Sequence, residues 1–99
     1  MLPFLHVARA EDWEAAQRSG EYAVPAGPDP FTHACTPEQL DGVLARFYAT
    51  TPRDELVLLE IEPEGLPVKV EAASDGFGDF PHVYGPIPLA NVIATRAVP

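Results

Sequence analysis

The chain has 99 residues, of which 46% are hydrophobic, and its 15 Asp and Glu outnumber 6 Lys and Arg to give a formal charge of −9. These values predict one globular domain, residues 1–99, with a single core, and they exclude a disordered or collagen-like chain. An acidic field repels phosphate backbones and anionic lipid surfaces, so we expect neither nucleic acid nor a membrane as partner.

The first predicted elements are a strand at 4–8, with His6 in its middle, and a helix at 11–19. Acidic residues at the start of this helix, Arg18 at its end and Gly20 as C-cap all suit the helix dipole. Trp13, Ala16 and Gln17 share one helix face. We expect a second short strand at 21–24, followed by a Pro- and Gly-rich loop or lid at 25–30.

The clearest local signal is the sequence 36–39, which combines an N-cap threonine, a proline at the first helical position and a capping-box glutamine. The helix that it starts should end before Pro52. Its apolar positions recur on one face and predict a stripe against the core, made of Leu40, Val43, Leu44, Phe47 and Tyr48.

The second half of the chain reads mainly as strands. Residues 55–62 are aliphatic enough for a central strand, 63–65 form a turn, 68–72 alternate as a further strand, and 91–98 close the chain as another. A flexible loop at 74–79 leads into segment 80–86. Because helices come early and strands follow, the pattern indicates an α+β fold with a mainly antiparallel or mixed sheet.

Cys35 is the single cysteine, which excludes an intramolecular disulfide and favours a reducing cytoplasm. The start of the chain has no basic region before a long apolar stretch, and no segment approaches the roughly 20 apolar residues that span a bilayer. We therefore expect a cytoplasmic protein, as a monomer or weak dimer.

Three histidines are candidates for chemistry: His6 in the first strand, His33 before the capped helix, and His82 in the last loop-bounded segment. Each histidine has apolar neighbours in the sequence, so we expect each ring to be partly buried. For any one of them considered alone, we expect a hydrogen bond from the ring to a backbone carbonyl. Convergence of all three in one pocket would instead indicate a site. No ligand pair has the spacing of a metal motif, and we predict no metal.

Two further groups have alternative interpretations. Cys35 near His33 suggests a thiol nucleophile, although a lone cysteine before a helix is more often a small buried residue. Glu71 near the end of its predicted strand places a carboxylate at the rim of the sheet, where it could orient a sugar hydroxyl or simply be solvated.

Six segments taken together resemble the bacterial family known as domain of unknown function 952, and they cover almost the whole chain. The segments are Leu5-His6-Val7, Trp13-Glu14, Phe31-Thr32-His33, Thr36-Pro37-Glu38-Gln39-Leu40, Val57-Leu58-Leu59-Glu60-Ile61 and Phe80-Pro81-His82-Val83-Tyr84-Gly85-Pro86. The last segment is the most specific of them.

This family looks like a compact relative of the ADP-ribosyltransferase fold. The resemblance implies a bent, split, mainly antiparallel sheet with two helices, around a cleft that takes NAD as substrate. It implies catalytic roles for His6, which would bind a ribose, for His33, and for Glu71, which would stabilise the oxocarbenium-like sugar as nicotinamide leaves. The ligand-binding residues that it implies are His82, Tyr84, Phe31 and Phe80.

Two other classes of function remain open at this point. A non-catalytic domain could use the same His and Tyr cleft to bind a nucleotide or another small molecule without breaking a bond. An interaction module would instead show an exposed apolar patch. The tRNA phosphotransferase role known elsewhere in this fold needs a basic surface, which a charge of −9 disfavours.

Overall fold

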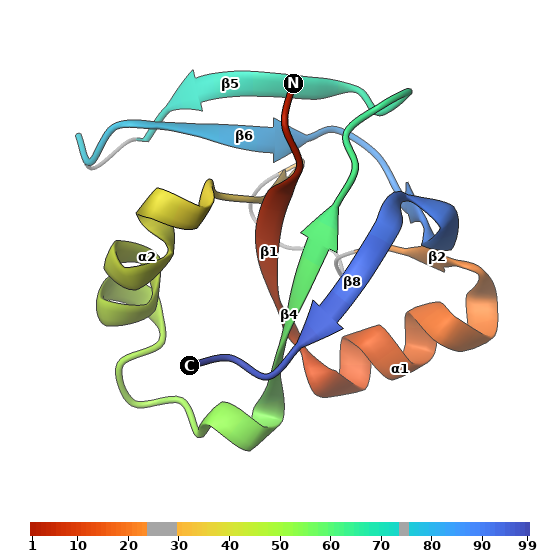
Figure 1. The fold of residues 1–99 in the computed structure, drawn as a ribbon, viewed down its shortest axis with the longest axis horizontal. Helices are drawn as coiled ribbons and strands as arrows, with labels where there is room; N and C mark the ends of the chain where they lie inside the picture. The colour runs from red at the N-terminus through yellow and green to blue at the C-terminus, as the bar shows by residue number, and fades with distance from the viewer. Residues whose placement is uncertain (24–29, 74–75) are drawn as a thin grey trace.

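A computed structural model describes residues 1–23, 30–73 and 76–99 (Figure 1). The described residues form an α+β fold with two α-helices, and every strand pair among them is antiparallel. The predicted loop at 25–30 falls largely outside this part of the chain, as do Val24 and the first two positions of the predicted loop at 74–79. None of the described helices is long and apolar enough to cross a membrane.

The first sheet has the order β1-β4-β8 and stands upright in Figure 1. It consists of β1 (Phe4–Arg9), β4 (Leu56–Ile61) and β8 (Val92–Arg96). The aliphatic run at 55–62 is thus confirmed as the central strand, since β4 pairs with β1 on one side and with β8 on the other. β1 lies at one edge of this sheet, so one side of its backbone is available to other segments.

The second sheet has the order β3-β6-β5, and its two longer strands cross the top of the first sheet in Figure 1. It consists of β3 (Thr32–His33), β6 (Asp79–Val83) and β5 (Val68–Ala72). The sequence predicted β5 but neither β3 nor β6. Pro81 obscured β6 because proline is rarely found inside a strand with neighbours on both sides. A small third pair joins β2 (Glu21–Tyr22) to β7 (Ile87–Pro88).

The segment 32–35 connects the two larger sheets. At its start it pairs with β6, where Ala34 N–H donates to the Pro81 carbonyl at 3.0 Å. At its end it pairs with β1, where Leu5 and Cys35 exchange two backbone hydrogen bonds of 2.7 and 2.8 Å. A single short segment therefore fixes the position of one sheet against the other and covers part of the free edge of β1.

The helices confirm the local capping signals. α1 (Ala10–Ser19) ends at Gly20, whose φ of 96° lies in the left-handed region and whose N–H bonds to the Ala16 carbonyl. α2 (Leu40–Phe47) follows a short 3-10 turn at Pro37–Gln39, and the Gln39 side chain accepts the Thr36 N–H at 2.9 Å. Two further 3-10 turns span Arg53–Glu55 and Leu89–Asn91.

The burial of the helix faces agrees with the predicted stripe except at one position of α2. On α1, Ala16 is buried and Trp13 is half-buried, whereas Gln17 is exposed. Phe47 was expected in the apolar stripe of α2 but is 61% exposed, whereas Leu40 and Leu44 are buried as predicted. The last turn of α2 extends beyond the apolar core, and this difference matters for the site described below.

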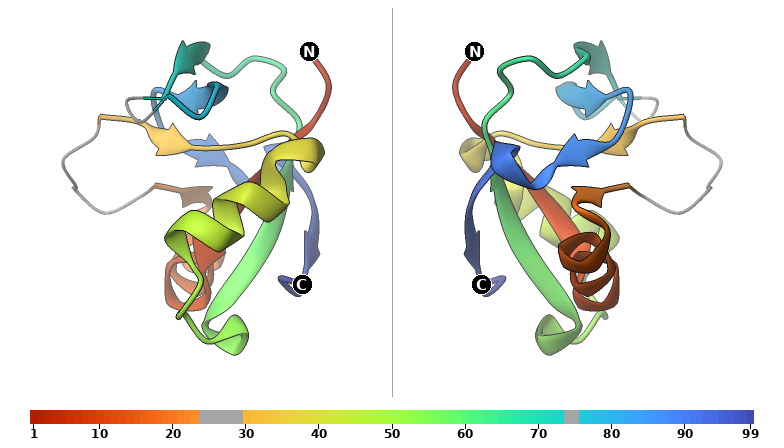
Figure 2. Two further views of the ribbon diagram at one scale, coloured as in Figure 1. Left: turned by 90° about the vertical axis from the view of Figure 1, so that its left-hand side faces the viewer. Right: turned by 90° about the vertical axis from the view of Figure 1, so that its right-hand side faces the viewer.

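The first sheet, β1-β4-β8, divides the expected single core into two clusters of buried residues. Alternate residues of β1 face opposite sides: Phe4 and Ala8 pack with Ala16 of α1, while Leu5 and Val7 pack with Leu44 of α2. Figure 2 shows α1 and α2 on opposite sides of this sheet. Because β1 is an edge strand, the region beside it can receive residues from both sheets and from α2.

Candidate functional site

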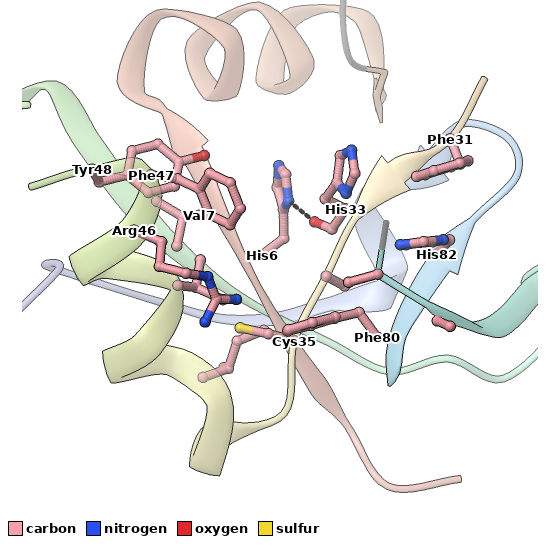
Figure 3. Close-up of a pocket in the computed structure, with 15 residues that line it drawn as sticks. His6, Val7, Phe31, His33, Cys35, Arg46, Phe47, Tyr48, Phe80 and His82 are labelled. Carbon is pink, nitrogen blue, oxygen red and sulfur yellow. Dashed lines mark hydrogen bonds between the residues drawn. The ribbon is translucent and has the colours of Figure 1, made fainter. Parts of the chain in front are cut away.

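A pocket of about 560 Å³ opens beside the edge of β1, between segment 31–35, α2 and the β5–β6 pair (Figure 3). Ligand sites for small molecules are commonly a few hundred to about 1,000 Å³. Its polar side chains are three histidines, Arg46, Cys35 and Tyr48, and the rest of the lining is mostly apolar. The described lining contains no Asp or Glu, although the chain has 15 of them. The lining thus differs in charge from the chain as a whole, whose formal charge is −9.

Five of the seven predicted site residues line this pocket: His6, His33, His82, Phe31 and Phe80. The strand register explains part of this convergence, because His33 in β3 lies directly opposite His82 in β6. The bridge between Leu5 and Cys35 then brings His6 beside His33.

The other two predicted residues, Glu71 and Tyr84, are absent from the lining and lie behind His82. Glu71 Oε1 accepts a hydrogen bond from the Tyr84 hydroxyl at 2.5 Å and contacts His82 Nδ1 at 2.9 Å. The Tyr84 bond, and after it the His82 bond, lower the pKa of Glu71, which keeps it a carboxylate. The carboxylate therefore accepts from a protonated Nδ1 and fixes the orientation of the His82 ring.

Both ring nitrogens of His6 are bonded within the protein. Nδ1 donates to the His33 carbonyl at 2.5 Å, because a carbonyl oxygen can only accept, and Nε2 accepts from the Tyr22 hydroxyl at 2.8 Å. Burial lowers the pKa of His6 to about 4 and raises the pKa of Tyr22, so His6 is a neutral base and Tyr22 a protonated donor at neutral pH. A contact from His6 to a ribose stays a prediction, and such a ribose would compete with Tyr22.

An aromatic stack forms the wall opposite α2. The Phe31 ring lies 3.9 Å from the His82 ring at an interplanar angle of 11°, and the edge of His33 meets His82 at 5.2 Å. On the outer side, Phe31 also contacts Tyr84 at 5.2 Å, and Lys69 Nζ lies 4.8 Å from the centre of the Tyr84 ring. This packing restrains the imidazole faces, so the wall is already formed without a ligand.

The main chain of Val7 is a further polar feature of the pocket. Residues of an antiparallel strand direct their N–H and C=O alternately to either side, and Leu5 uses this edge of β1 to bond Cys35. Val7, two residues later, therefore directs both groups to the same edge. Val7 is buried and lines the pocket, and on this edge no hydrogen bond joins its main chain to another described residue. Buried main-chain groups normally have partners, so this edge is suited to a ligand.

Cys35 lies in the pocket but does not have the properties of a nucleophile. Burial raises the pKa of its thiol to about 11, which leaves little thiolate at neutral pH. The thiol hypothesis is therefore not supported. In the described residues, no group of three or more His, Cys, Asp or Glu side chains is arranged to hold a metal ion.

Sequence reasoning did not identify Arg46, Phe47 or the Val7 main chain as parts of the site. The Arg46 guanidinium reaches into the pocket from α2 and lies over the rings of Phe77 at 4.0 Å and Phe80 at 5.9 Å. One signal was present, because Arg46 follows Val43 by three positions and so borders the apolar stripe of the helix.

A family model described as "Protein of unknown function (DUF952)" matches residues 7–95. The chain belongs to this family. The crystal structure of protein CC0527 from Caulobacter crescentus is similar to this DUF952 chain with a TM-score of 0.83 and 28% identity, over 96% of this chain and 84% of that one. The solution structure of CC0527 gives a TM-score of 0.78 and 29% identity, over 98% and 84%. A comparison with curated proteins finds no significant match.

Proposed function

We propose that this DUF952 domain binds a small nucleotide-like molecule in the pocket beside β1, with NAD as the first candidate and no metal ion. The observation that carries the proposal is the composition of the lining. A pocket of about 560 Å³ collects three imidazoles and a guanidinium and has no carboxylate among its described residues, in a chain with a charge of −9. Such a lining favours a neutral or anionic ligand over a cation.

The main chain and the aromatic wall suit the base of such a ligand. The N–H and C=O of Val7 form a donor and acceptor pair that a planar amide, such as a carboxamide, can satisfy with two hydrogen bonds. Phe80 and Phe31 supply apolar surface for a ring nearby. A few fixed polar groups within an apolar lining are typical of small-molecule sites.

The geometry favours binding over group transfer. The transferase hypothesis requires Glu71 to stabilise a sugar cation, which needs a carboxylate in direct contact with the ligand. Glu71 instead lies behind His82, and the Tyr84 hydroxyl and the His82 ring share one of its oxygens. We therefore place a binding domain first and an NAD-dependent ADP-ribosyltransferase second.

Thermal unfolding with NAD, ADP-ribose and nicotinamide tests the proposal. A ligand that binds only the folded state adds about 2.7 kcal/mol at a hundredfold excess over its Kd, which for this chain length raises Tm by roughly 10 °C or more. Phe31→Ala should abolish the shift, whereas Ile93→Ala, at an exposed position on β8, should not change it. No shift with any of the three at millimolar concentration would favour the interaction module instead.

Nicotinamide release from NAD, followed by chromatography, separates binding from transfer. Binding without release supports our first proposal. Release that Glu71→Gln abolishes, with the ligand-induced Tm shift retained, would place the transferase first and show that Glu71 moves towards the ligand.

A further inference from the structure

Arg46 differs from Arg53 and Arg96 in the contacts that the described residues make with its guanidinium. Arg53 donates to the carbonyls of Pro99 at 3.0 Å and Tyr48 at 2.8 Å, and Arg96 reaches Glu60 at 3.3 Å. Within the described part of the chain, no hydrogen bond or ion pair joins Arg46 to another residue, and its Nε is fully buried. A buried donor without an acceptor is rare. Because Arg46 as a whole is half-buried and lines the pocket, its Nη donors are the ones that a partner from outside the protein can reach.

Aromatic rings hold the guanidinium in place without using its donors. Its central carbon lies 4.0 Å from the centre of the Phe77 ring, 5.3 Å from Phe47 and 5.9 Å from Phe80. Cation–π contacts engage the face of the guanidinium, whereas its five N–H donors lie in its plane. The edge of the group is thus left for a planar or bidentate acceptor such as a phosphate or carboxylate. The exposed positions of Phe47 and Phe77 are explained by this role.

Gly42, one turn before Arg46 on α2, leaves room for this arrangement. A Cβ atom at position 42 would lie 3.3 Å from Nη1 of Arg46, which is closer than nine in ten such contacts, so the guanidinium would have to shift by a few tenths of an ångström. A glycine inside a helix makes the helix less stable than an alanine would, so Gly42 lowers the stability of α2. Because Gly42 has no side chain, the guanidinium can rest against the helix. Figure 3 shows the Arg46 side chain extending from α2 into the pocket.

We infer that Arg46 is the anion receptor of the pocket, binding a phosphate group of the nucleotide-like ligand and making the site select a phosphorylated nucleoside over its unphosphorylated form. The inference rests on the proposed binding function and names the ligand class of that site. No carboxylate in the described lining competes with a phosphate for this arginine.

Isothermal titration calorimetry of the whole chain with two matched pairs tests this inference. The pairs are nicotinamide mononucleotide against nicotinamide riboside, and AMP against adenosine, which differ only in the phosphate. In the wild type we expect the phosphorylated member of the pair that binds to have a Kd about tenfold lower or better, as charge-assisted hydrogen bonds provide. Arg46→Met should remove this difference by raising the Kd of the phosphorylated member to about that of the neutral member.

Three further variants distinguish specific phosphate binding by Arg46 from a general effect of positive charge and from a loss of folding. Arg96→Met removes an exposed positive charge on β8 and should preserve the phosphate preference. Arg46→Lys keeps the positive charge but lacks the planar guanidinium with its paired donors, so it should retain only part of the phosphate preference. Gly42→Ala favours the helix but crowds Nη1, so it should weaken binding of the phosphorylated member without lowering Tm.

The outcomes distinguish the inference from the function on which it rests. Equal affinity for both members of a pair in the wild type, or a phosphate preference that Arg46→Met leaves intact, would overturn the role of Arg46 while binding in the pocket stands. No measurable binding of any of the four probes would overturn both.

Discussion

The buried neutral His6 predicts that the protein loses stability in weak acid. The pKa of His6 is about 4 in the folded chain and 6.5 as its ordinary value, chiefly because burial disfavours the charged ring. Between these two pH values the unfolded chain binds more protons than the folded chain does. The free energy of unfolding therefore has its full value above pH 6.5 and decreases as the pH falls towards 4.

The size of the effect follows from the two pKa values. The whole difference corresponds to about 3 kcal/mol, and the part between about pH 7 and about pH 5 is about 2 kcal/mol. This is a large fraction of the total stability of a small domain. The lowered pKa of Glu71 acts in the same direction but at lower pH, since its contribution to stability is present above its ordinary value of 4.5 and is lost only as the pH falls below that.

Urea denaturation of the wild type and of His6→Gln at a series of pH values measures this contribution. The wild type should lose about 2 kcal/mol more than the variant between about pH 7 and about pH 5. Ile93→Ala, which changes an exposed, non-titrating side chain on β8, serves as the control and should retain the wild-type dependence. An equal pH dependence in wild type and His6→Gln, or an NMR titration of His6 centred near 6.5, would refute the reasoning.

Three other predictions follow from single contacts. Tyr22→Phe leaves Nε2 of His6 without a donor and should lower the free energy of unfolding by about 1–3 kcal/mol in urea; an unchanged midpoint would contradict the bond. Gly20→Ala places a side chain on a residue whose φ is 96° and should lower the free energy of unfolding by about 1 kcal/mol in the same urea experiment. A clearly smaller loss would argue against the left-handed conformation of residue 20 at the end of α1. Tyr84→Phe should raise the pKa of Glu71 towards its ordinary value in a carbon-13 NMR titration, and a constant pKa would assign its cause elsewhere.

The elements set by local interactions were the ones that the sequence predicted well. The capping glutamine at 39 bonds the backbone three residues before it, and Gly20 closes the helix that precedes it. The central strand at 55–62 was recognisable because a strand covered on both sides needs apolar residues throughout. In each case the residues that determine the structure lie within a few positions of one another.

The site was predictable only in part because it depends on pairing between distant segments. The three histidines were candidates singly, but their convergence requires the register of His33 with His82 and the bridge from Leu5 to Cys35. The periodicity of α2 located its apolar face correctly. It could not show that the last turn of that face meets a pocket instead of a core, so Phe47 was misplaced.

Residues 33–35 form part of the pocket lining, and the four-residue segment 32–35 to which they belong also holds the two larger sheets together. Substitutions in this segment would change ligand preference and fold stability at once, so few of them can be tolerated. On the opposite side, the end of α2 lines the pocket and Phe77 packs against Arg46; among the strand pairs of the described residues, none includes either of them. Divergence of specificity among related domains should therefore be concentrated at positions 43–48 and 77, with the segment 32–35 kept constant.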